Sequence, residues 1–90
     1  MTNQEIIEKI YKLQLLLKDK NALIANALEK ATIPLIEYEK ELQSASIQDL
    51  IKIKGIGEAS ASLVMQIIEG RHVYEIATNA QRPKKKPRWE

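Results

Sequence analysis

Apolar residues recur at the period of an α-helix along most of the chain, with polar residues between them. The first such stripe consists of Ile6, Ile10, Leu13 and Leu17. Thr2 and Glu5 precede it at the spacing of a capping box, so we expect a helix over about 3–18. The stripe could also join two copies of the chain, but it lasts barely two heptads, so burial within one domain is the favoured interpretation.

A second helix is expected after Asn21, whose side chain can cap apolar positions that run from Ala22 to Ala31. Pro34 lacks an N–H and restricts the residue before it, which predicts an interruption of this helix. We therefore expect a new helical segment over 35–42. Its buried side would consist of Leu35, Ile36, Tyr38 and Leu42.

Two further helical patterns are joined by Gly55-Ile56-Gly57. A second capping box, at 46–49, predicts a short helix over about 47–53 before these glycines. A longer helix is expected from Glu58 to Glu69, with Gly70 ending it.

The segment 71–76 is expected to be a short closing turn, in which Val73 and Ile76 cover the end of the bundle and His72 is a surface or capping residue. Periodicity is lost after Ala77. The pattern thus predicts an all-α, compact domain of four to five helices over 1–77, followed over 78–90 by a basic tail that we expect to be disordered.

The turn at Gly55-Ile56-Gly57 is the strongest candidate for a binding site. We expect positive φ at both glycines, with Ile56 inserted into the core and the backbone N–H groups pointing outward as an anion cradle. The spacing resembles a helix-hairpin-helix, over 47–69, a motif that grips the sugar-phosphate backbone of DNA. The candidate DNA-binding residues here are Lys52, Lys54, Gly55, Ile56, Gly57, Ala59 and Ser60. The alternative is an ordinary turn that only packs two helices.

Charge is distributed unevenly along the 90 residues, whose net charge is +2. The last nine carry +4, so residues 1–81 carry −2. The tail cations, which could bind DNA or act as a nuclear-import signal, are Arg82, Lys84, Lys85, Lys86 and Arg88, and Trp89 could stack on a base. The chain has no cysteine, and charged residues near its start interrupt any signal peptide, so we expect an intracellular protein, cytoplasmic or nuclear.

Over about residues 3–76 the sequence resembles the N-terminal small, lyase-type domain of family X (beta-like) DNA polymerases. The resemblance rests on the segments 27–31, 50–57 and 69–73. It implies four helices around one core, single-stranded, gapped or duplex DNA as a ligand, and a role in DNA repair or replication. It also implies a monovalent cation, Na⁺ or K⁺, held by the backbone carbonyls of Ile51, Ile53 and Ile56; no other cofactor is expected.

The same resemblance argues against lyase activity. The family places its Schiff-base lysine six residues after the second glycine, where this chain has Leu63, and further pocket residues correspond to Ile24, Leu28 and Ala59. An apolar side chain cannot attack a carbonyl. No nucleophile–base pair, metal cluster or phosphate loop is visible elsewhere, and a palm domain for polymerase activity is missing, so we expect no enzyme. An alternative function is a protein-interaction adaptor or homodimer that uses an apolar surface around Ile24, Leu28 and Leu63.

Overall fold

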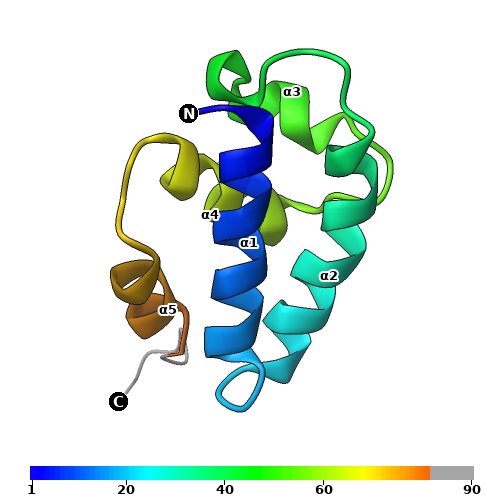
Figure 1. The fold of residues 1–90 in the computed structure, drawn as a ribbon. Coiled ribbons are helices and arrows are strands. Elements are labelled where there is room, and N and C mark those ends of the chain that lie inside the picture. Colours follow the sequence, from blue (N-terminus) through cyan, green and yellow to red (C-terminus); the bar gives the residue numbers. More distant parts are fainter. Residues whose placement is uncertain (82–90) are drawn as a thin grey trace, which may run out of the picture.

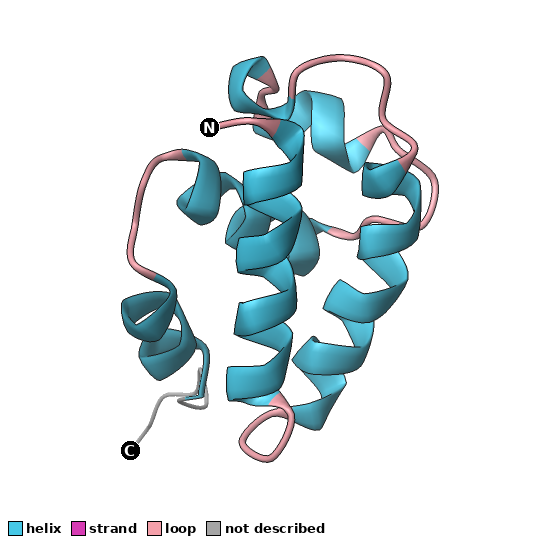
Figure 2. Ribbon diagram, in the orientation of Figure 1, coloured by secondary structure: helices cyan, strands magenta, loops and turns pink. Residues whose placement is uncertain are grey.

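Two antiparallel helices, α1 (Asn3–Leu17) and α2 (Ala22–Ile36), lie side by side and form the centre of the computed structural model, which describes residues 1–81 (Figure 1). They are followed by the 3₁₀ helix η1 (Leu42–Ser44) and by α3 (Ile47–Ile51), α4 (Glu58–Ile68) and α5 (Val73–Gln81). Within the described residues all regular structure is helical (Figure 2). The all-α class is therefore confirmed, while the predicted disordered tail falls outside these residues from 82 onward.

The predicted caps fix where the helices begin. The Thr2 hydroxyl accepts the Glu5 N–H at 3.1 Å, and the Glu5 carboxylate accepts the Thr2 N–H at 2.8 Å. Ser46 and Asp49 repeat this reciprocal pair at the start of α3. The bond from the backbone N–H lowers the pKa of each carboxyl, Glu5 and Asp49, because it favours the ionised form.

The interface between α1 and α2 is mainly apolar, with one polar link. Ile6, Ile10, Leu13 and Leu17 are buried, as the stripe predicts. Thr32 is buried among them, and its hydroxyl donates to the Leu28 carbonyl at 2.7 Å while it accepts from the Gln14 amide at 3.0 Å. The hydroxyl is thus satisfied as both donor and acceptor, so its burial does not carry the usual cost of an unpaired polar group.

The predicted break at Pro34 is wrong, because α2 continues through it to Ile36. Pro34 stands in the last turn, where it lacks the N–H that would bond to the Lys30 carbonyl and its ring crowds that carbonyl. The helix nevertheless continues for two residues, and Leu35, the first of them, is fully buried in the core. The expected helix over 35–42 is instead a loop followed by η1. Of its predicted buried side, Leu35 and Leu42 are buried, Tyr38 is half-buried and Ile36 is 55% exposed.

The Asn3 side chain of α1 makes two hydrogen bonds to the backbone at and just before η1. Asn3 donates to the Lys40 carbonyl and accepts the Leu42 N–H, both at 2.8 Å. Leu42 is thereby delivered to the core even though no long helix carries it.

The last helix corrects a second prediction, since the expected closing turn over 71–76 is the beginning of α5. His72 caps this helix: its Nδ1 accepts the Tyr74 N–H at 3.3 Å and its carbonyl accepts the Ile76 N–H at 3.0 Å. Val73 and Ile76 are buried as expected. The helix ends at Gln81, four residues beyond the predicted domain boundary, and Asn21 donates to the Ala80 carbonyl at 3.0 Å. No helix in the described part is long and apolar enough to cross a bilayer.

Candidate nucleic-acid interface

The two glycines of the turn between α3 and α4 have different conformations. Gly55 has φ +98°, which favours glycine, whereas Gly57 has φ −89° and ψ 177°, an extended conformation that any residue adopts. The expectation of positive φ at both is therefore wrong at Gly57. Ile56 lies between them with its side chain 5% exposed, so its predicted insertion into the core is confirmed.

The N-terminus of α4 lacks a side-chain cap. Thr2, Asn21 and Ser46 cap the first three α-helices with a side-chain oxygen, but Gly57 has no such group to offer the N–H groups of Ala59 and Ser60. The first four N–H groups of a helix have no partner inside it, and the helix dipole makes them attractive to an anion. A Cβ built at Gly57 would meet no atom within 4 Å, so the space in front of these donors is open.

These donors face a hollow of about 410 Å³ between the turn and α2, which we call the hairpin hollow. Its lining consists of Leu23, Asn26, Ala27, Lys30, Gly55, Gly57, Ala59 and Ser60. The two elements are in contact behind it, since a Cβ on Gly55 would lie 3.9 Å from the Pro34 ring.

Lys30 and Asn26 are the residues of this site that sequence reasoning missed. Both are exposed on α2, on the edge that also carries Leu23 and Pro34 at helical spacing. The only signal in the sequence was this spacing relative to Pro34, and it points to the hollow only once α2 is known to lie beside the turn. An ammonium group and an amide are groups that bind phosphate oxygens.

The predicted DNA-binding residues are only partly brought together. Gly55, Gly57 and Ala59 line the hairpin hollow. Ser60 also lines it, but its side chain is only 3% exposed, so the N–H is what this residue can offer at the start of the helix. Lys52 and Lys54 are exposed beside the turn without lining the hollow. The tail cations Arg82, Lys84, Lys85, Lys86 and Arg88 lie outside the described residues.

The predicted apolar surface is largely interior, which corrects the basis of the adaptor hypothesis. Leu28 is fully buried and Leu63 is 8% exposed, while Ile24 is half-buried and Ala59 is exposed. Leu28 and Leu63 belong to the same core cluster as Leu13. They face the core rather than a partner because their positions fall on the inner sides of α2 and α4.

The carbonyls of Ile51, Ile53 and Ile56 come from the end of α3 and the turn after it. The Ile53 carbonyl accepts the Ile56 N–H at 3.1 Å, so one of its two lone pairs remains for a cation. Three backbone carbonyls within one turn are compatible with a monovalent cation, which stays a prediction. Residues 1–81 contain no group of three or more His, Asp or Glu side chains suited to a metal ion.

Comparisons of the chain with protein-family models, with curated proteins and with solved structures find no match. The function must therefore be inferred from the residues themselves.

Proposed function

We propose that residues 47–69 form a helix-hairpin-helix and that the chain is a non-enzymatic module that binds DNA without reading its sequence, in DNA repair or replication. The observation that carries the proposal is the uncapped N-terminus of α4, which faces the hairpin hollow with Lys30 on the opposite wall. An anionic ligand would satisfy donors that the protein leaves without a side-chain partner.

A DNA phosphate in the hairpin hollow would accept the N–H groups of Ala59 and Ser60 and receive the charge of Lys30. Gly57 permits close approach because no Cβ stands in the way. Lys52 and Lys54, exposed beside the turn, would contact adjacent phosphates. Such contacts fix the position of the nucleic acid but carry no base information, which is why we propose sequence-independent binding.

Long-range attraction requires cations beyond this site, because residues 1–81 carry a net −2. Glu58, exposed in the first turn of α4, opposes an approaching phosphate. We therefore assign to the basic segment 82–90 the attraction of DNA, and to the hairpin hollow its positioning. The resemblance to the family X domain supports single-stranded and gapped DNA as ligands, and Leu63 in place of the family's lysine supports a module without lyase activity.

The test measures fluorescence polarisation of labelled single-stranded, duplex and gapped DNA at two salt concentrations, with Lys30→Gln compared to Lys20→Gln. Both variants remove one exposed lysine, but Lys20 lies in the turn between α1 and α2. We expect Lys30→Gln to reduce the slope of log affinity against log salt by about 0.7–0.9, the value of one phosphate contact. Equal affinity and slope in the two variants would exclude Lys30 from the interface, and binding that hardly depends on salt would favour the adaptor function instead.

A further inference from the structure

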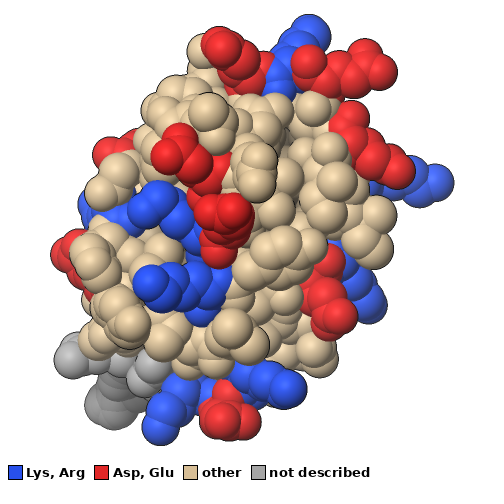
Figure 3. Space-filling view, in the orientation of Figure 1, with Lys and Arg blue, Asp and Glu red and all other residues tan. Residues whose placement is uncertain are grey.

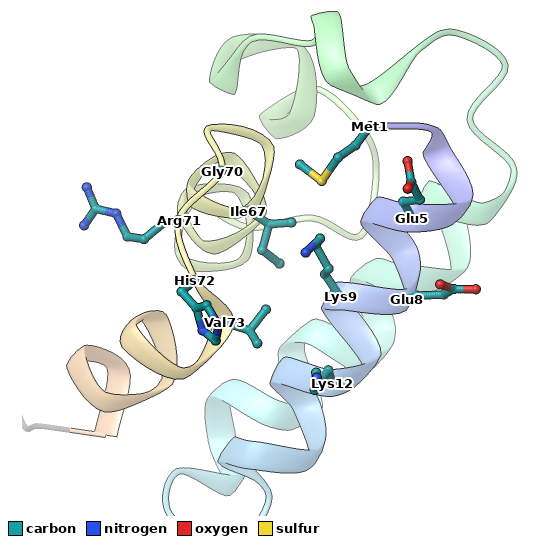
Figure 4. Close-up of a pocket in the computed structure, with 10 residues that line it drawn as sticks. All are labelled: Met1, Glu5, Glu8, Lys9, Lys12, Ile67, Gly70, Arg71, His72 and Val73. Carbon is teal, nitrogen blue, oxygen red and sulfur yellow. The ribbon is translucent and has the colours of Figure 1, made fainter.

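A second hollow, of about 430 Å³, lies between α1, the end of α4 and the start of α5 (Figure 4). Its floor includes Ile67 and Val73, and its walls include Lys9 and Lys12 from α1 and Arg71 from the connection before α5. We call it the α1–α5 hollow. It shares no lining residue with the hairpin hollow.

Cations outnumber carboxylates in this hollow, although residues 1–81 are net negative. Lys9, Lys12 and Arg71 line it together with Glu5 and Glu8. The Glu5 carboxylate accepts the Thr2 N–H, which lowers its pKa together with the charges of the N-terminus and Lys9, so Glu5 stays ionised near Lys9. In Figure 4 Lys9 extends toward Ile67, whereas Glu8 points to the far side of α1 and the Arg71 guanidinium points outward, away from α1. In Figure 3, Lys and Arg side chains lie on this side of the molecule with Asp and Glu side chains beside them. Lys9 and Lys12 are therefore the cations that α1 offers to an anion in this hollow, and Arg71 offers a third on its outer side.

An aromatic pair stands at the lower edge of the α1–α5 hollow. The rings of His72 and Tyr74 are stacked with their centroids 5.3 Å apart, and the Lys12 ammonium lies 5.6 Å from the Tyr74 centroid. Tyr74 is 53% exposed and His72 is exposed, so the pair does not serve the core. An exposed aromatic pair beside a lysine, at a hollow with further cations in its lining, suits single-stranded nucleic acids, because bases stack on aromatic rings while cations hold the phosphates.

We propose that the α1–α5 hollow binds a single-stranded segment of nucleic acid, with Lys9, Lys12 and Arg71 at its phosphates and one base on the His72–Tyr74 pair. This inference rests on the proposed function in that the strand would belong to the DNA held by the hairpin hollow. It goes beyond that function because it assigns a separate site and a reason to prefer unpaired bases. A duplex keeps its bases stacked inside and would use only the phosphate contacts.

The first experiment compares two double variants of the full chain, Lys9→Gln/Arg71→Gln and the control Lys18→Gln/Lys20→Gln. Each removes two exposed cations, and the control pair lies at the opposite end of α1. The probe is a labelled oligothymidine of about 12 nucleotides, within the usual site size of a small module. We expect the Lys9→Gln/Arg71→Gln variant to reduce the slope of log affinity against log salt by about 1.4, because each of two single-strand phosphate contacts contributes about 0.7. Equal slopes in the two double variants would overturn the proposal.

The second experiment isolates the stacking interaction through Tyr74→Leu, which keeps an apolar side chain on an exposed helical position. We expect it to weaken oligothymidine binding by at least about fivefold, the low end for one stacked base, and to leave binding of an abasic oligomer of equal length unchanged. An equal loss for both probes would show that no base stacks on Tyr74 and would overturn this assignment.

Amide chemical shifts separate the two sites within one titration of the ¹⁵N-labelled full chain with the same oligothymidine. Shifts at Gly70, Arg71 and His72 that persist in Lys30→Gln support the α1–α5 hollow even if the hairpin hollow fails to bind. Shifts confined to Gly57, Ala59 and Ser60 overturn the present inference while the proposed function stands.

Discussion

Replacing Gly57 with serine should change the affinity for DNA without lowering the stability of the fold, so the two effects can be measured separately. The backbone at Gly57 already has the extended conformation of a helix N-cap, and an added Cβ meets no atom within 4 Å. A serine can therefore adopt the native conformation without strain, and its hydroxyl can accept the Ser60 N–H. Because serine is the better N-cap by a few tenths of a kcal/mol, we expect the stability of Gly57→Ser to be equal to or slightly above that of the wild type.

The same substitution should weaken DNA binding, because the serine hydroxyl takes a donor that the phosphate would use and its Cβ narrows the approach. A hydrogen bond to a charged group contributes about 1.5–3 kcal/mol, so its loss corresponds to a decrease in affinity of about tenfold or more. Gly57→Ala is the matched control, because it adds the Cβ without the competing oxygen. Thermal unfolding followed by circular dichroism gives the stability, and fluorescence polarisation with gapped DNA gives the affinity.

Gly55→Ala is the comparison variant that should lower the stability of the fold. At φ +98° any side chain is strained, at a cost of about 1–3 kcal/mol, and each kcal/mol lowers Tm by about 4–8 °C in a domain of this size. If Gly57→Ser destabilises the protein as much as Gly55→Ala does, Gly57 does not have the extended conformation described above. If Gly57→Ser keeps full affinity, the N-terminus of α4 does not bind phosphate.

Two further predictions concern the core and the caps. Leu28→Ala should lower the free energy of unfolding, measured by chemical denaturation, by about 2–5 kcal/mol, because Leu28 is fully buried. A decrease below about 0.5 kcal/mol would indicate that Leu28 is on an accessible surface instead. The lowered pKa values of Glu5 and Asp49 mean that both carboxylates stabilise the fold above their unfolded pKa and lose this contribution as the pH falls through the lower, folded values. Unfolding midpoints measured from pH 6 downward should therefore fall more for the wild type than for Glu5→Gln/Asp49→Asn below about pH 4, and parallel curves would contradict this linkage.

The parts of the fold that sequence predicted well are those set by local chemistry. Thr2 with Glu5 and Ser46 with Asp49 are reciprocal hydrogen-bonding pairs that need no distant residue, and the structure contains both. Pro34 failed as a stop signal because its local cost is opposed by tertiary packing, such as the burial of Leu35 directly after it, which the proline itself does not reveal. The start of α5 was missed because His72, an uncommon cap, follows Gly70 after a single residue, although Val73, Ile76, Ala77 and Ala80 have helical spacing.

The candidate site was predictable only on one of its two walls. The turn is continuous in sequence, so Gly55, Ile56 and Gly57 could be identified, although spacing alone could not distinguish φ +98° from φ −89°. The other wall comes from α2, and Lys30 enters the site only because the packing of α2 on α4 brings the two elements together. The α1–α5 hollow was missed for the same reason, since Lys9 and Arg71 are far apart in sequence.

The burial of Leu63 and Leu28 bears on the proposal that the chain has no lyase activity. Leu63 is 8% exposed and Leu28 is fully buried, so both fill space that a reactive site would have to keep open. A lysine at either position would place its ammonium group in an apolar cluster that contains no carboxylate to pair with it. The loss of hydration would then cost free energy unless the amine were neutral. The polar groups of the hairpin hollow are instead the lysine and asparagine of α2 and the N–H groups of α4, at its rim. These groups can hold a phosphate, which is the contact that the proposed binding of DNA requires.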